Sequence, residues 1–225
     1  MAARHVTRLF AWLALATGAP ATGASAGALP AAFAFAAFGL VIVWAVLWLP
    51  RAAHTAFEAG KFRRATRRYW LIGAVTISAR RERGALLSRA GCAVATGRFD
   101  AADQLLARVD GTALDAAERA VWLNNRAYAA LRRGTDARAA LALADEASGL
   151  RPDVPAIQHT RGLALLAVGR VDDAIGVLDA MRAGGELPPR LEAARCRELA
   201  TAWDAKGEAA YAEDYRVRAQ SLAAG

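Results

Sequence analysis

Residues 122–153, WLNNRAYAALRRGTDARAALALADEASGLRPD, contain the pattern that decides the fold of this chain. Apolar and small side chains recur three and four residues apart on both sides of Gly134, which is the spacing of one face of an α-helix. A glycine between two such stretches can take the left-handed conformation that ends the first helix, and Pro152 stops the second. The stretch therefore predicts a helical hairpin.

The same pattern recurs along the chain. Five glycines are 37, 37, 35 and 38 residues apart: Gly60, Gly97, Gly134, Gly169 and Gly207. The residue seven positions before each glycine is small: Ala53, Ala90, Ala127, Gly162 and Ala200. The residue five positions after each glycine is alanine: Ala65, Ala102, Ala139, Ala174 and Ala212. Small side chains at these two positions let paired helices approach closely, so the sequence predicts an array of five hairpins.

These units resemble the tetratricopeptide repeat (TPR), whose period is about 34 residues. The quoted third unit has the asparagine-rich first helix and the closing proline of that family, and AIQHTRGLALLAVGRVDDAIGVLDAMRA (residues 156–183) follows in register. Units one, two and five match the family pattern less well. In unit one Pro50 shortens the first helix, and in unit five Arg216 stands where a bulky apolar residue is usual. Unit three has one extra residue after Gly134. The resemblance covers roughly residues 51–220.

The resemblance implies an all-α fold, a TPR-like α-solenoid of about five helix-turn-helix units. Proteins of this family mostly bind peptides or partner proteins and share no chemistry. Within the array, residues 183–190 form the one obvious flexible joint, because they contain two glycines and two prolines.

An uncharged segment precedes the repeats. No charged side chain occurs in residues 9–50, and residues 31–49 are 19 mostly apolar residues. About 20 such residues cross a bilayer, so the sequence predicts a transmembrane helix at 31–49. Residues 1–30 have two interpretations. A basic start, a short apolar stretch and Ala24-Ser25-Ala26 are typical of a signal peptide, but the same residues also suit the first helix of a membrane hairpin.

Basic residues predict the side of the membrane on which the repeats lie. Residues 51–68 hold six lysines and arginines, against only Arg4 and Arg8 before the apolar segment. The positive-inside rule then places the repeats in the cytoplasm, and a periplasmic location is the alternative. With 27 arginines against 2 lysines, the composition suggests a GC-rich bacterial genome and hence a bacterial inner membrane.

The net charge of +8 is concentrated just after the apolar segment. Residues 51–90 hold ten basic residues against Glu58 and Glu82, whereas residues 91–225 carry a net charge of −2. This distribution gives little support to nucleic-acid binding. Four arginines occupy the outer side of the helix predicted after Gly60: Arg63, Arg64, Arg67 and Arg68. They either contact anionic lipid headgroups or form a solvated face that fixes the topology.

First-helix residues are predicted to line the concave groove of the array and to bind a partner: Asn124, Asn125, Tyr128 and His159. Arginine also precedes the small contact residue in three successive units, at Arg89, Arg126 and Arg161. Stacked repeats would align these guanidinium groups into a ladder that receives an acidic peptide or headgroup. The alternative is that each stem covers apolar surface and its head stays in water.

Catalysis and cofactor binding have no support in the sequence. The histidines, His5, His54 and His159, have no second metal ligand at helical spacing, and no serine has a recognisable partner set. Cys92 and Cys196 each fall in a first helix, where we expect them to be reduced and buried.

Our main hypothesis is a membrane-anchored, non-catalytic TPR scaffold or adaptor that binds partner proteins or peptides. One alternative is an anchored periplasmic assembly factor for a secreted client. Another is a binder of anionic lipid or nucleic acid through the basic segment 61–83, which predicts strong salt dependence.

Overall fold

The computed structural model describes residues 37, 39, 40 and 43–224. The chain forms two compact units, Met1–Thr96 and Gly97–Gly225, which we call the N-terminal unit and the C-terminal unit. The segment predicted for residues 1–30 and part of the predicted span at 31–49 lie outside the described residues. In the described part of the chain, no helix combines the length and the apolar character needed to cross a membrane.

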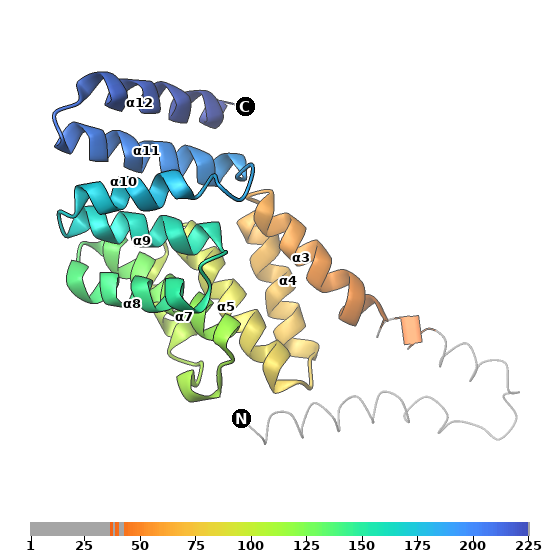
Figure 1. The fold of residues 1–225 in the computed structure, drawn as a ribbon. Coiled ribbons are helices and arrows are strands. Elements are labelled where there is room, and N and C mark those ends of the chain that lie inside the picture. Colours follow the sequence, from red (N-terminus) through yellow and green to blue (C-terminus); the bar gives the residue numbers. More distant parts are fainter. Residues whose placement is uncertain (1–36, 38, 41–42, 225) are drawn as a thin grey trace, which may run out of the picture. The chain divides into compact units, whose positions relative to one another are not determined.

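The N-terminal unit contains α3 (Leu49–Glu58), α4 (Phe62–Val75) and α5 (Ala79–Ala95), which follow a five-residue π-helix, η1 (Trp44–Trp48). The inner face of α4 is buried in the core of this unit, where Ala65, Tyr69 and Ile72 pack with residues of α3 and α5 and Phe62 is partly buried beside them. Figure 1 shows α3 and α4 side by side.

Pro50 lies in the first turn of α3, where the helix needs no amide donor from it. The α-helical part begins one residue before Pro50, at Leu49. However, the backbone remains helical before it. In η1 the Leu49 N–H bonds to the carbonyl of Trp44, five residues back, which is the wider turn of a π-helix.

The C-terminal unit consists of α6 (Phe99–Leu106) and three complete hairpins. These are α7 (Ala116–Arg133) with α8 (Ala137–Leu150), α9 (Pro155–Ala167) with α10 (Val171–Ala180), and α11 (Pro189–Ala205) with α12 (Ala209–Ala224). A 3₁₀-helix, η2 (Gly111–Ala113), precedes α7. The hairpins lie one on the next (Figure 1). The described residues thus contain the ten α-helices expected of five hairpins.

The hairpin glycines behave as predicted. Gly60, Gly97, Gly134, Gly169 and Gly207 all have positive φ, between 66° and 80°. The small residues seven positions earlier are buried contacts between helices. Gly162 shows the reason most clearly, because a Cβ there would lie 2.7 Å from the side chain of Leu178 on α10.

One predicted contact is wrong. Ala139, five residues after Gly134, is exposed, and Ala140 is buried in its place. The cause is the extra residue of the third unit, because Asp136 caps α8 by accepting from the Ala139 N–H and the helix starts one residue later than in the other units. Every side chain of α8 is therefore displaced by one position relative to its glycine.

Other helix ends follow the sequence. Asp115 and Glu118 form a capping box at the start of α7, with the Glu118 N–H 2.9 Å from Asp115 Oδ1. Pro155 begins α9 after α8 has ended at Leu150. Cys92 and Cys196 are buried and unbridged, as expected.

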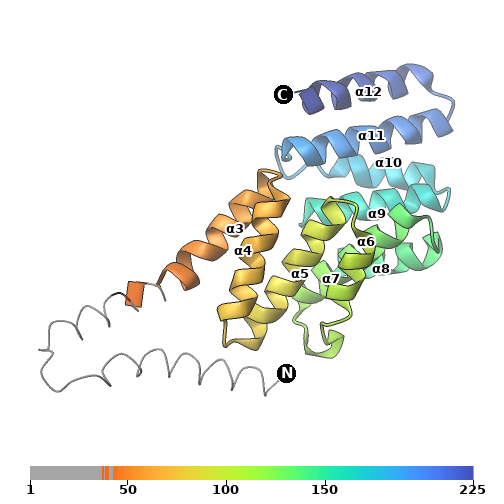
Figure 2. The same ribbon diagram turned by 180° about the vertical axis from the view of Figure 1, so that it is seen from behind.

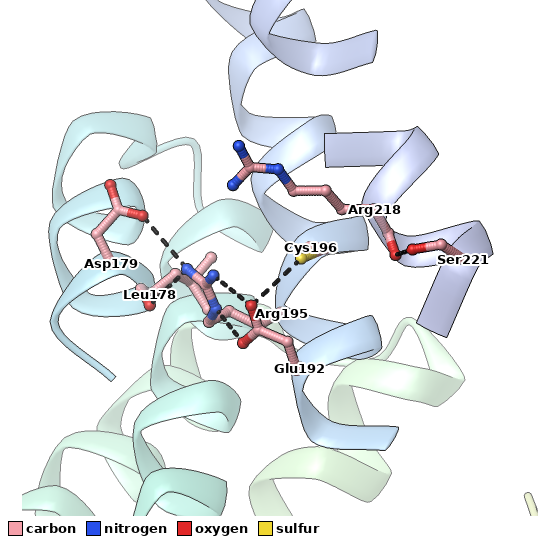
Figure 3. Close-up of polar contacts among 7 residues, drawn as sticks. All are labelled: Leu178, Asp179, Glu192, Arg195, Cys196, Arg218 and Ser221. Atoms are coloured by element: carbon pink, nitrogen blue, oxygen red, sulfur yellow. Dashed lines mark hydrogen bonds and ion pairs between the residues drawn. The ribbon is translucent and has the colours of Figure 1, made fainter. Parts of the chain in front are cut away.

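A buried arginine holds α11 against α10 across the joint at residues 183–190. Arg195 on α11 is only 2% exposed. Its Nε and Nη2 donate to the two carboxylate oxygens of Glu192 at 2.8 and 2.7 Å. Its Nη1 reaches the carbonyl of Leu178 and Asp179 Oδ1 at the end of α10, each at 3.4 Å (Figure 3). Hydrogen bonds from Arg195 lower the pKa of Glu192.

Candidate functional site

The first helices of the C-terminal unit, α7, α9 and α11, place three polar residues at the same repeat position. Asn124, His159 and Arg197 each lie ten residues before the glycine of their hairpin. Since α7 contacts α9 and α9 contacts α11, these residues form a row across three helices. Tyr128 and Leu163 lie one turn further along α7 and α9. We call these five residues, together with Arg132, the first-helix face.

His159 is the buried centre of this face. His159 is only 5% exposed, and the centroid of its ring lies 6.3 Å from the centroid of the Tyr128 ring. Burial, with help from Arg197 and Arg132, lowers the pKa of His159 to about 4, so the imidazole is neutral at neutral pH. Its Nε2 is buried and has no hydrogen-bond partner within the described part of the chain.

Asn124 repeats this situation on α7. Its Oδ1 is buried and also has no hydrogen-bond partner among residues 43–224. A buried polar atom without a partner costs about 1–3 kcal/mol, so such atoms are rare in folded proteins. Asn124 and His159 hold two of these atoms at one repeat position, and this coincidence makes the row the candidate site.

Charged side chains surround the row. Arg132 at the end of α7 and Arg197 on α11 are both exposed. Both act on His159 and on the half-buried Glu198. Burial raises the pKa of the Glu198 carboxyl, while the two arginines act against that rise. With two guanidinium groups and one carboxyl, the surroundings of His159 favour an anionic ligand.

The other predicted partner-binding residues take different roles. Asn125 is a buried residue of α7, with 6% of its surface exposed. The guanidinium of Arg126 lies over the ring of Trp122, 4.5 Å from its centroid. Arg161 Nε donates to Asp145 Oδ1 on α8 at 2.7 Å. Both guanidinium groups are therefore engaged within the chain.

Arg89, the third member of the predicted ladder, lies half-buried on α5 of the N-terminal unit. A ladder through all three arginines stays a prediction. Arg126 lies over the apolar ring of Trp122, as in the alternative, whereas Arg161 pairs with Asp145 of the preceding hairpin, which neither interpretation predicted.

The predicted membrane-surface arginines divide into two groups. Arg63, Arg64 and Arg67 are exposed on α4. Arg68 instead turns toward α3, where its Nη1 donates to the carbonyl of Ala52 at 2.6 Å. His54 on α3 is also on the surface and pairs with Glu58 at 3.1 Å.

Sequence reasoning missed Arg132, Arg197 and Glu198 as members of a site. The register would have indicated Arg197, because it occupies the position of Asn124 and His159. Arg132 and Glu198 carry no such signal. As for metals, the described residues contain no group of three or more His, Cys, Asp or Glu side chains placed to bind an ion.

Comparisons with known proteins support the fold. No family model and no curated protein matches the chain. Among solved structures, the TPR-like repeats of a protein described as a kinesin light chain from Podosopora anserina superpose with a TM-score of 0.50 at 19% identity. The match covers 78% of this chain and 93% of that one. A second structure, of a substituted form of that protein, gives a TM-score of 0.51 at 18% identity, covering 77% of this chain and 92% of that one.

The MamA MSR-1 structure is also similar, with a TM-score of 0.46 at 18% identity over 80% of this chain and 97% of that chain. At these identities the similarity concerns the fold alone. The kinesin light chain matches confirm the predicted all-α, TPR-like helical repeat.

Proposed function

We propose that this protein is a membrane-tethered, non-catalytic scaffold whose first-helix face binds an acidic segment of a partner protein. The observation that carries the proposal is the row of Asn124, His159 and Arg197, with Arg132 nearby: the two arginines can hold carboxylates, and a backbone N–H of the bound segment can donate to Asn124 Oδ1, which has no partner among the described residues. TPR-like arrays commonly bind partners through stacked first helices, which supports the same assignment.

The chemistry of the face suits a carboxylate-bearing segment. Arg132 and Arg197 can each hold a carboxylate with two parallel hydrogen bonds. Tyr128 and Leu163 offer apolar surface between them. Neighbouring helices lie about 10 Å apart, so an extended segment of about six residues, at about 3.3 Å per residue, spans the three first helices.

The tether is the apolar segment 31–49, with the repeats on the cytoplasmic side of a bacterial inner membrane. Its support is the uncharged run of residues 9–50 and the six basic residues that follow within 51–68. An anchored periplasmic assembly factor is the competing function, and it requires the opposite sidedness. Reporters fused to the C-terminus, one active only in the cytoplasm and one active only outside it, separate the two.

Peptide binding tests the face itself. The full-length chain in nanodiscs is titrated with a fluorescent six-residue acidic peptide and with its amide counterpart, in which Asn and Gln replace Asp and Glu. We expect preferential binding of the acidic peptide, reduced at least tenfold by Arg132→Gln with Arg197→Gln. The matched control is Arg138→Gln, an exposed arginine on α8. Equal binding of both peptides, or equal loss in the control, contradicts the proposal.

A further inference from the structure

The outer face of α4 in the N-terminal unit carries arginines and an exposed tryptophan. Arg63, Arg67 and Trp70 follow at spacings of four and three residues, and Arg64 lies at the edge of the same face. They lie opposite the buried stripe of Ala65, Tyr69 and Ile72. Figure 2 shows α4 beside α3. Trp70 is 56% exposed although it is among the largest apolar side chains of the unit.

These arginines are available to a ligand. The structure gives Arg63, Arg64 and Arg67 no hydrogen bond, ion pair or ring contact with any described residue. Arg68 provides the contrast on the same helix, because it bonds to Ala52 of α3 and lies over the ring of Trp48 at 5.9 Å. Of the four arginines of α4, Arg68 therefore binds α3, and the other three are exposed to solvent.

The segment that leads into α3 exposes apolar side chains in the same unit. Trp44 and Trp48 stack with ring centroids 5.9 Å apart, and both are exposed. Val43 and Leu47 are also about half exposed, at 53% and 51%. The contact of Arg68 with Trp48 joins this apolar segment to α4. The basic helix α4 therefore contacts the exposed pair of Trp44 and Trp48 through Arg68.

We propose that α4 lies on the surface of an anionic lipid bilayer. In this arrangement Arg63, Arg64 and Arg67 contact the phosphate groups of the lipids, and Trp70 enters the interface between headgroups and acyl chains. The apolar side chains beside the basic face favour a bilayer over a nucleic acid, which would leave them in water. The inference relies on the proposed tether only to bring a bilayer close to this unit.

Quenching of Trp70 by brominated lipid tests the contact. The full-length chain is reconstituted in nanodiscs of phosphatidylcholine, with or without about one third phosphatidylglycerol. The signal of Trp70 is the difference between the wild-type chain and Trp70→Phe. We expect this signal to be quenched at least twofold more in the anionic discs, and the excess to disappear at high salt.

The decisive variant combines Arg63→Gln, Arg64→Gln and Arg67→Gln and should abolish the excess quenching. Its matched control combines Arg108→Gln, Arg138→Gln and Arg182→Gln, three exposed arginines of the C-terminal unit, and should leave it unchanged. Equal quenching of Trp70 in neutral and anionic discs overturns the proposal. So does binding of a fluorescent oligonucleotide that requires the three α4 arginines while Trp70 is indifferent to lipid charge.

Failure of the tether has a separate signature. A chain without a membrane-spanning segment would be released from vesicles by alkaline carbonate, whereas a tethered chain whose α4 does not dock would stay with the vesicles and show no excess quenching.

Discussion

The outer face of α4 and the joint between α10 and α11 both depend on arginine, but in opposite ways. Arg63, Arg64 and Arg67 are exposed and have no partner among the described residues, whereas Arg195 is buried and reaches four acceptor oxygens. A buried guanidinium needs every one of its contacts, while an exposed one can be exchanged at little cost to stability. The comparison separates arginines that maintain the fold from those that are free to bind.

The largest effect should come from breaking the buried pair. Arg195→Met leaves the Glu192 carboxylate, 16% exposed, without its partner. We expect the free energy of unfolding to fall by about 3 kcal/mol, as for other buried pairs from which one partner is removed. Urea unfolding followed by tryptophan fluorescence measures it. Adding Glu192→Met should recover part of the loss, and a double variant as unstable as Arg195→Met would show that the ion pair is not the cause.

Acid should weaken the C-terminal unit through His159. The folded pKa of about 4 lies below the ordinary value of 6.5, so the unfolded chain binds the extra proton first. The stability contributed by the neutral imidazole is complete above pH 6.5 and is lost as the pH falls toward 4. We expect a loss of about 2–3 kcal/mol between about pH 7 and pH 4, measured by urea unfolding.

The control for this pH dependence is His159→Gln, which should flatten the curve between pH 6.5 and 4. Glu192 affects the free energy of unfolding at lower pH than His159 does, because Arg195 lowers the pKa of its carboxyl in the folded chain. Its contribution is present above the ordinary glutamate pKa of about 4.3 and is lost below it. A curve unchanged by His159→Gln would contradict the buried, neutral state of this histidine.

A smaller effect should distinguish glycines that need their small size from those that do not. Gly162→Ala places a Cβ 2.7 Å from Leu178, so we expect about 1–2 kcal/mol of destabilisation from overpacking. Gly176→Ala, in the middle of α10, has no atom within 4 Å of the new Cβ and should be neutral or stabilising by about 0.5–1 kcal/mol. Thermal unfolding of the two variants compares them directly, and equal shifts would refute the close approach of α9 and α10.

The smallest effect on stability should come from α4. Combined replacement of Arg63, Arg64 and Arg67 by Gln should change the free energy of unfolding by less than about 0.5 kcal/mol, because none of them has a partner in the described structure. The same variant should lose lipid-charge-dependent quenching. A destabilisation comparable to that of Arg195→Met would erase the contrast between the two regions.

The fold could be predicted from the sequence because its decisive contacts repeat. Each hairpin glycine and its small partner residue recur at fixed offsets, so five weak signals reinforce one another. The error at Ala139 shows the limit of this reasoning. An inserted residue changes which alanine faces the neighbouring helix, and here the N-cap formed by Asp136 decides that α8 buries Ala140.

The site was only partly predictable, because its charged members come from different repeats and influence one another electrostatically. Asn124, Tyr128 and His159 could be assigned to first helices from the pattern alone. Arg132 on α7 and Arg197 on α11 act on His159 and on Glu198 from different helices, which no local motif indicates. Arg195 was missed for the same reason, since its partner Asp179 lies on the far side of the joint.

Photo-crosslinking in intact cells tests the central claim most directly. A photoreactive amino acid replaces Leu163 on the first-helix face or, as a control, Arg138 on α8 in the full-length chain. The account predicts a crosslinked partner protein at position 163 alone, and loss of that product when Arg132 and Arg197 are changed to Gln. Equal products at both positions, or a product at 163 that survives those changes, would contradict it.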